Sequence, residues 1–253
     1  MKITFLGTGT SQGVPVIGCE CEVCRSLDYR DKRLRVSVHL EIDGVSLVID
    51  TGPDFRQQML RERISKLDAV LLTHSHKDHI AGLDDVRAFN FLQERGMPIF
   101  GTTKTLEQVK KEFYYAFEDE KYPGTPILQL HEIKETEFEF KGIKILPLPV
   151  LHLRMPVLGF RVGDFSYITD ANLIPEETLS RLKGTKVLVL NALQKEKHVS
   201  HFNLEEAIEQ AARIGAEQTY FTHISHKMGL HKSVSSELPE SIALANDGLT
   251  VTL

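Results

Sequence analysis

The segment at residues 67–79, LDAVLLTHSHKDH, constrains the fold more than any other part of the sequence. A mostly apolar stretch, typical of a buried strand, stops abruptly at four side chains of metal-ligand type: His74, His76, Asp78 and His79. In an extended segment His74 and His76 point to the same side, and a tight turn brings Asp78 and His79 into a neighbouring position. The segment therefore predicts a metal site at the end of a buried strand.

The rest of the chain predicts alternating strands and helices in two similar halves. An Asp43-Gly44 turn between apolar runs indicates a β-hairpin near the N-terminus. The second half repeats a local pattern of the first, because Thr222-His223 follows an apolar strand as Thr73-His74 does. We expect an α/β protein with two packed β-sheets and helices on both outer faces, an αββα sandwich. The helices are expected at residues 55–63, 79–94, 105–117, 175–182 and 203–216.

Composition narrows the class of protein. A hydrophobic content of 42% in 253 residues can supply a sizeable core, and no Gly, Pro or Ser-rich linker divides the chain, so we expect one domain over residues 1–253. The formal net charge of -5 argues against a nucleic-acid scaffold, and the basic stretch at residues 29–35 is expected to be a solvated loop. No apolar run is long enough to cross a bilayer, and residues 1–10 do not resemble an export signal. We therefore expect a cytoplasmic protein.

All three cysteines lie within six positions, as Cys19, Cys21 and Cys24. An odd number of cysteines in a cytoplasmic protein argues against a disulfide framework. Metal binding or catalysis remains as the role of the cluster, and nothing nearby in the sequence would activate a catalytic thiol.

The motif H-x-H-x-D-H after an apolar strand, preceded by VIDTG at residues 48–52, resembles the metallo-β-lactamase superfamily. The resemblance implies an active site with two divalent metal ions. One ion would take His74, His76 and His152, the other would take Asp78, His79 and His223, and Asp170 would bridge them. Asp50 would orient one of the ligand imidazoles, and a turn-forming aspartate after a strand is the alternative. Imidazole and carboxylate ligands suit zinc, manganese and iron alike.

His201 bears on the reaction. Asn203 and Glu206 resemble a capping box that begins a helix, so His201 lies in the loop before a helix N-terminus. An imidazole there could bind a phosphate oxygen and protonate a leaving alkoxide, and taken alone it would be an exposed loop histidine. A histidine before that helix resembles the phosphodiesterase branch of the superfamily, which implies that His201 is the general acid. His198 is the competing candidate.

The N-terminal segment GTGTSQGVPVIGCECEVC is similar to the beginning of the phosphoribosyl 1,2-cyclic phosphate phosphodiesterases of the carbon–phosphorus lyase pathway. In that family three cysteines and one histidine hold a structural zinc. The resemblance implies that Cys19, Cys21, Cys24 and His226 form this site, and three free thiols are the alternative. A set of three thiolates and one imidazole suits a closed tetrahedral zinc site.

We expect a metal-dependent phosphodiesterase that hydrolyses a small, cyclic phosphodiester by a hydroxide activated at two metal ions. His201 would act as the general acid, and Asp78 would be both ligand and catalytic residue. The alternatives are a tRNA 3′-processing endonuclease, a thioester or lactone hydrolase of the same fold, and a metal-binding module without turnover. The expected partner is a small-molecule substrate rather than nucleic acid or membrane, and a homodimer remains open.

Two departures from that family bear on the substrate. Leu151 and Arg154 flank His152, and the segment at residues 112–126 is rich in aromatic side chains. These aromatics could line a pocket near the site, form a dimer contact or pack in the core.

Overall fold

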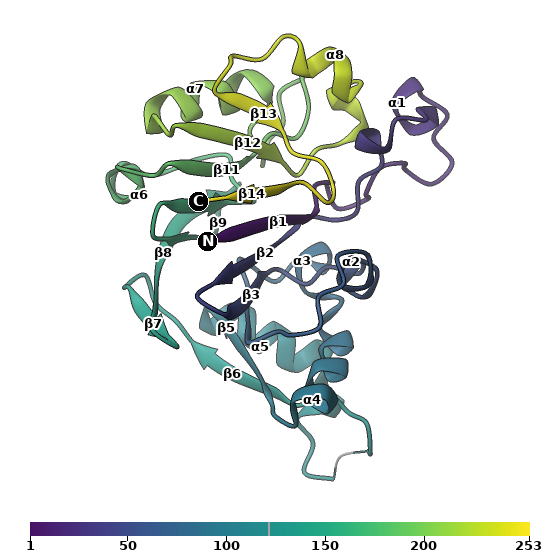
Figure 1. The fold of residues 1–253 in the computed structure, drawn as a ribbon, viewed down its shortest axis with the longest axis vertical. Helices are drawn as coiled ribbons and strands as arrows, with labels where there is room; N and C mark the ends of the chain where they lie inside the picture. Colours follow the sequence, from purple (N-terminus) through teal and green to yellow (C-terminus); the bar gives the residue numbers. More distant parts are fainter. Residues whose placement is uncertain (121) are drawn as a thin grey trace.

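Two seven-stranded sheets pack face to face in the computed structural model, which describes residues 1–120 and 122–253 (Figure 1). The first sheet contains, in spatial order, β14 (Thr250–Thr252), β1 (Lys2–Gly7), β2 (Ser37–Ile42), β3 (Val45–Ile49), β4 (Ala69–Leu71), β5 (Met97–Gly101) and β6 (Leu128–Glu132). The second contains β13 (Ile242–Leu244), β12 (Gln218–Thr222), β11 (Val187–Asn191), β10 (Phe165–Ile168), β9 (Met155–Val162), β8 (Ile143–His152) and β7 (Phe138–Phe140). The predicted αββα sandwich is confirmed.

The helices cover the two outer faces. Those of the first half include α2 (Phe55–Arg61), α3 (Lys77–Ile80), α4 (Arg87–Gln93) and α5 (Thr103–Glu112), drawn in blue tones in Figure 1. Those of the second half are α6 (Glu176–Leu182), α7 (Leu204–Ile214) and α8 (His231–Ser235). Short elements complete the set: α1 (Glu22–Arg25) and the 3-10 turns η1 (Tyr29–Asp31), η2 (Leu83–Val86), η3 (Tyr114–Ala116) and η4 (His226–Met228).

Apolar side chains separate the four layers. One cluster lies between the sheets and joins residues of both, such as Leu40, Leu47, Phe160 and Tyr167. Two further clusters lie between each sheet and its own helices. Because both faces of each sheet are buried, strands such as β3 and β11 are apolar at nearly every position rather than alternating.

The strand directions bring the carboxyl ends of several strands to a common edge. Strands β3, β4, β5 and β6 are parallel, and so are β10, β11, β12 and β13. Strand β8 is antiparallel to β9, and β9 is antiparallel to β10, so β8 runs in the same direction as β10. The carboxyl ends of β3 and β4, and those of β8, β10 and β12, therefore lie at a common edge within their sheets.

Two predicted helices differ from the structure. The helix expected at residues 79–94 is divided into α3, η2 and α4, because the Gly82 N–H donates to the Thr51 carbonyl at 2.8 Å rather than to the preceding helical turn. A side chain on Gly82 would collide with the carbonyl oxygen of Gly52, so the close approach requires glycine. The helix expected at residues 105–117 begins earlier, at the Thr102 cap, and ends at Glu112 before η3.

The basic stretch at residues 29–35 is not the solvated loop expected of it. Arg33 is buried, and its guanidinium donates hydrogen bonds to Thr8 Oγ1 (2.7 Å) and to the Ala245 carbonyl (2.6 Å). Arg35 pairs with Asp54 at 3.1 Å. The stretch therefore fastens the N-terminal segment to the body of the protein.

The aromatic-rich segment contributes to the core at its beginning. Phe113 is buried in the cluster beneath α5, and the Tyr115 hydroxyl donates to Asp84 at 2.6 Å. Tyr114 and Tyr122 are exposed, and Lys121 of this segment lies outside the described residues. Among the described helices, none has the length and apolar character needed to cross a membrane.

Candidate metal and catalytic site

The predicted ligand side chains gather at the common carboxyl edge of the strands. Asp50 follows β3, the HSHKDH segment follows β4, His152 ends β8, Asp170 follows β10 and His223 follows β12. Helix α3 begins directly after His76 and positions the other two ligand side chains of the HSHKDH segment, Asp78 and His79. Residues more than 140 positions apart are thus brought to one place by the strand order.

Their ligand atoms form two groups that share one carboxylate. The first group is His74, His76, His152 and Asp170, and the second is Asp78, His79, Asp170 and His223. Within each group the ligand atoms all lie within 4.8 Å of one another. This division, with Asp170 common to both groups, is the one that the sequence resemblance implies.

The atoms facing the centre of the two groups lack ordinary partners. The Nε2 atoms of His74, His79 and His223 are buried and make no hydrogen bond of acceptable geometry with any described residue. His223 Nε2 lies 3.2 Å from Asp170 Oδ1, and His79 Nε2 lies 3.4 Å from Asp170 Oδ2. Buried polar atoms without partners are costly, whereas a divalent cation among them would satisfy imidazole and carboxylate together. The residues present therefore fit two divalent ions.

The charges of the site depend on one another. Burial opposes ionisation of Asp170, but the neighbouring His223 and His79 hold the pKa of its carboxyl well below the usual range. Burial likewise opposes protonation of His79, yet Asp78, Asp50 and Asp170 raise the pKa of its imidazole well above the usual value. Carboxylates close to these imidazoles leave the centre rich in negative charge, as a site for cations requires.

Asp50 holds one ligand imidazole in place. Its carboxylate accepts hydrogen bonds from the Thr73 N–H (2.9 Å), from Thr73 Oγ1 (2.8 Å) and from His79 Nδ1–H (2.7 Å). Because Nδ1 donates to Asp50, Nε2 of His79 faces the shared carboxylate. The sequence analysis did not identify Thr73 as a site residue, although its position directly before His74 could have indicated one.

A backbone carbonyl orients a second imidazole. His152 Nδ1–H donates to the carbonyl oxygen of Ser200 at 2.8 Å. The loop that precedes α7 therefore fixes a ligand at the end of β8. No sequence signal pointed to Ser200, because a backbone acceptor does not depend on the residue type.

The two candidate general acids occupy different positions. His201 is buried, and its Nε2 lies 3.3 Å from Asp170 Oδ2, at the centre of the site. His198 is exposed and lies behind it, with its Nδ1 3.2 Å from His201 Nδ1. The expected capping box is present, since Asn203 Oδ1 accepts from the Glu206 N–H (2.8 Å) and Glu206 Oε2 accepts from the Asn203 N–H (3.0 Å). Burial lowers the pKa of His201 to about 4, against the effect of Asp170.

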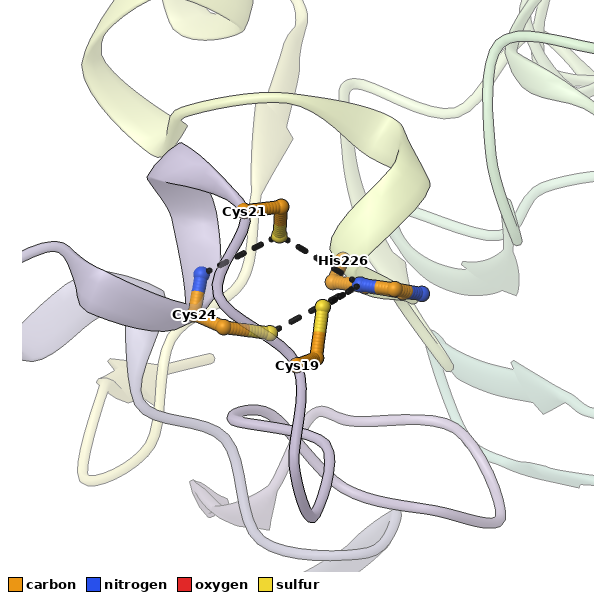
Figure 2. Close-up of side chains that lie close together, drawn as sticks. All are labelled: Cys19, Cys21, Cys24 and His226. Atoms are coloured by element: carbon orange, nitrogen blue, oxygen red, sulfur yellow. Dashed lines mark hydrogen bonds between the residues drawn. The ribbon is translucent and has the colours of Figure 1, made fainter.

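The three cysteines lie around the imidazole of His226 (Figure 2). The distances from His226 Nδ1 to the Sγ atoms of Cys19, Cys21 and Cys24 are 3.2, 3.4 and 3.6 Å, and all three cysteines are free of disulfides. The Cys24 N–H lowers the pKa of Cys21 to about 6, whereas burial raises that of Cys24 to about 11. Three sulfurs and one imidazole nitrogen at these distances suit a tetrahedral zinc site.

A cleft of about 500 Å³ opens beside the first group of ligands. Its lining is His76, Lys104, His152, Leu153, Arg154, Met155, Val199 and Ser200. A cleft of this volume is within the range for small-molecule sites. Tyr115 and Tyr122 of the aromatic-rich segment line a different cavity, with Asp84 and Arg87, and that cavity shares no residue with this cleft.

Comparisons with known proteins agree with the geometry. The profile of the family described as "Beta-lactamase superfamily domain" matches residues 46–224. The crystal structure of a diphosphatase from the PhnP family is 41% identical, with a TM-score of 0.93 over 99% of this chain and 96% of that one. A ribonuclease Z of Mycobacterium sp. (strain KMS) is 28% identical, covering 88% of this chain and 84% of that protein.

An octanoyltransferase of Porphyromonas gingivalis is 40% identical over 98% of this chain, but this chain spans only about half (51%) of its length. The family profile covers most of the chain, and the diphosphatase matches nearly all of it. The chain therefore belongs to the beta-lactamase superfamily and, within it, is a PhnP-like hydrolase.

Proposed function

We propose that the protein is a metal-dependent phosphodiesterase that hydrolyses a small, preferably cyclic, phosphodiester. The observation that carries this proposal is the position of His201, whose Nε2 lies 3.3 Å from Oδ2 of the shared carboxylate Asp170 and which precedes the capped helix α7. A buried imidazole beside a two-cation centre suits protonation of an alkoxide that leaves phosphorus. Two relatives named as a diphosphatase and a ribonuclease support cleavage of phosphate bonds.

The two groups of ligands would hold two divalent ions of zinc, manganese or iron, and we assign zinc to Cys19, Cys21, Cys24 and His226. The two ions held by the strand-end ligands would supply Lewis-acid activation of a water molecule and of the phosphoryl oxygens. Asp50 and the Ser200 carbonyl keep the ligand imidazoles in the tautomer that presents Nε2.

His201 would handle the proton of the leaving group at Nε2. In the free chain burial lowers its pKa to about 4. An anionic phosphate beside Nε2 would favour the protonated imidazole. His198 contacts only the outer nitrogen, Nδ1, of His201 and would position it.

Hydrolysis of a diphosphate is the second candidate, and the 41% identity to the diphosphatase favours it. Action on tRNA is less well supported, since the net charge of the chain is -5 and the ribonuclease Z relative is only 28% identical. The match to the octanoyltransferase covers 51% of that protein, so its transferase name is not carried over.

A substrate panel with zinc- and with manganese-loaded protein tests the proposal. The panel contains adenosine 2′,3′-cyclic phosphate, bis(p-nitrophenyl) phosphate, adenosine diphosphate, a precursor tRNA and an acyl thioester. We expect kcat/KM to be highest for the cyclic ester and His201→Ala to lower it by about 100-fold. Faster cleavage of precursor tRNA would overturn the preference for small substrates. Thioester hydrolysis that survives His201→Ala would point to the thioesterase alternative.

A further inference from the structure

A second cavity lies at the end of the first sheet opposite to the metal ligands. Its volume is about 300 Å³, and it shares no residue with the cleft beside the strand-end ligands. Strand β3 connects the two ends, because Ser46 near its start lines the cavity and Asp50 follows its last residue. The volume is at the lower end of the range for small-molecule sites. The lining also includes Lys2 and Thr4 of β1, His39 and Glu41 of β2, and Arg63 after α2.

The cavity exists because α2 covers only part of the outer face of its sheet. Side chains two positions apart on a strand point to the same face, so Thr4 shares a face with Leu6, and Ser46 shares a face with Val48. Leu6 and Val48 pack against the helices, whereas Thr4 and Ser46 line the cavity. Helix α2 ends before the cavity, and the chain at residues 62–66 forms the other wall. The polar part of this face therefore lies open to a small ligand.

A buried histidine presents an acceptor to the cavity. His39 is only 7% exposed, and its Nε2 lies 2.8 Å from Ser46 Oγ. Because the Ser46 hydroxyl donates its single proton to the Lys66 carbonyl (2.7 Å), His39 Nε2–H is the donor to Ser46 Oγ. Burial lowers the pKa of His39 to about 4, so the ring is neutral at neutral pH and Nδ1 carries a free lone pair. Nδ1 makes no hydrogen bond with any described residue, so it is available to a donor in the cavity.

Three charged side chains of the lining have no partner among the described residues. Lys2, Arg63 and Glu41 make no side-chain hydrogen bond or ion pair within residues 1–120 and 122–253. Lys2 and Glu41 are directly opposite each other in the register of β1 and β2, yet they form no ion pair. The other charged lining residues, Glu62 and Lys66, pair with neighbouring side chains at 2.6 and 3.1 Å. The cavity therefore offers two cations and one anion to a ligand.

The end of α2 holds Arg63 in place. The Arg63 N–H donates to the Leu60 carbonyl (3.3 Å), and the Ile64 N–H donates to the Met59 carbonyl (3.0 Å), which are the two bonds of a Schellman motif. Arg63 has a φ of 54°, a left-handed conformation that glycine adopts without steric cost. The arginine therefore contributes its side chain to the cavity at a cost in backbone energy.

We infer that this cavity binds a polar α-amino acid. The carboxylate of the ligand pairs with Lys2 and Arg63, and its ammonium pairs with Glu41. A hydroxyl or amide of the ligand side chain donates to His39 Nδ1. A zwitterion matches the free charges of the lining, whereas a simple anion leaves the Glu41 carboxylate unpaired beside its own charge. This site is independent of the proposed reaction.

Calorimetric titration of the metal-loaded protein with L-serine, L-threonine, L-asparagine and L-glutamine tests the inference. We expect at least one of the four to bind with a Kd of about 1 mM or lower. The amine and the carboxylic acid that correspond to the tightest ligand, each lacking one of the two charged groups, should bind about tenfold more weakly or worse. L-Alanine, which lacks a side-chain donor, should also bind more weakly.

Matched variants locate the site. Arg63→Gly removes the guanidinium and suits the left-handed backbone, so we expect affinity to fall by about tenfold or more while Tm is unchanged or higher. Glu41→Gln should lower the affinity by about tenfold because it removes the charge that pairs with the ammonium. Arg56→Gln, an exposed residue of α2 outside the cavity, is the control and should keep the affinity within about twofold.

Amino acids also chelate metal ions, so binding at the strand-end centre is the alternative outcome. Affinity that Arg63→Gly and Glu41→Gln both leave unchanged assigns the ligand to the metal centre and overturns the inference. Equal affinity for the carboxylic acid without its amino group overturns the assignment of a zwitterion. The absence of binding by all four amino acids at about 10 mM overturns the inference as well. None of these results bears on phosphodiester cleavage, which the substrate panel measures separately.

Discussion

The two candidate metal sites are built in opposite ways. The ligands of the shared-carboxylate centre come from the ends of strands in both sheets, and all but His76 are buried. The cysteine site takes three ligands from one six-residue stretch and one from η4, and only Cys24 is buried. The apolar cluster beneath that stretch is small, with Val14, Val23 and Cys24 as its buried members.

This difference teaches what the fold supplies to each site. The centre at the strand ends is held by the same packing that holds the sandwich together, so we expect its geometry to persist without metal. The N-terminal segment around the cysteines buries little apolar surface, so we expect a bound ion to contribute to holding it in place. Loss of metal should therefore affect activity at one site and stability at the other.

The largest effect is expected from His76→Ala. The variant removes an imidazole from the first group of ligands, and we expect kcat/KM to fall by about 1000-fold or more because a metal centre supplies several kcal/mol of transition-state stabilisation. Metal analysis should show the cysteine-site zinc retained. His131→Ala, an exposed histidine on β6, is the control and should keep full activity. Loss of the zinc from both sites in His76→Ala would show that the sites are not independent.

Cys21→Ser should act on stability first. We expect the variant to lose about one zinc per chain and to unfold at a lower temperature, because the zinc holds the N-terminal segment to η4. Chelation of the zinc from the unaltered protein should reproduce the shift in Tm. An unchanged metal content would contradict the assignment of zinc to the cysteines.

Asp50→Asn should weaken the strand-end centre without removing a ligand. The variant loses the charge that accepts His79 Nδ1–H, and replacing such a partner lowers metal affinity or activity by about 10–100-fold. Competition with a chelator and kcat/KM measure the two effects. Asp43→Asn, in the turn at the opposite end of the same hairpin, is the matched control. Equal metal affinity in the Asp50→Asn and Asp43→Asn variants would contradict the assignment of an orienting role to Asp50.

The smallest effect concerns the attachment of the N-terminal segment and depends on pH. His231 Nδ1 accepts from Arg33 Nη2–H at 3.0 Å, and the backbone N–H of His231 donates to Asp31 Oδ1 at 2.8 Å. Burial, then Arg33 and Arg30, lower its pKa to about 4, against Asp31 and Asp28. The folded pKa of His231 lies below the unfolded value of about 6.5. The contribution of neutral His231 to the free energy of unfolding is therefore complete above pH 6.5 and is lost as the pH falls toward 4.

His231→Gln removes the titrating group and keeps an acceptor for Arg33. Between pH 7.5 and pH 5, the unaltered protein should lose up to about 2 kcal/mol more of its free energy of unfolding than the variant, as measured by urea denaturation. His39, whose pKa burial also lowers to about 4, is present in both proteins and cancels in the difference. Parallel loss of stability in the two proteins would exclude His231 as the source.

Local spacing explains how much of the site the sequence could predict. The two groups of ligands come together as the resemblance implied. Local spacing alone predicts only near pairs such as His74 and His76. The capping box before α7 was predicted for the same reason, since its two hydrogen bonds join residues three positions apart.

Contacts between distant segments were decided only by the tertiary structure. The Gly82 N–H bonds to the Thr51 carbonyl and so interrupts a helix that the local pattern made continuous. Arg33 can be buried because Thr8 Oγ1 and the Ala245 carbonyl, both distant in sequence, accept hydrogen bonds from its guanidinium. The Ser200 carbonyl that orients His152 has no signature in the residue type. Lys104 and Arg154 line one cleft because the first turn of α5 and the turn between β8 and β9 meet beside the strand ends. The hydrophobic periodicity of either segment does not predict that contact.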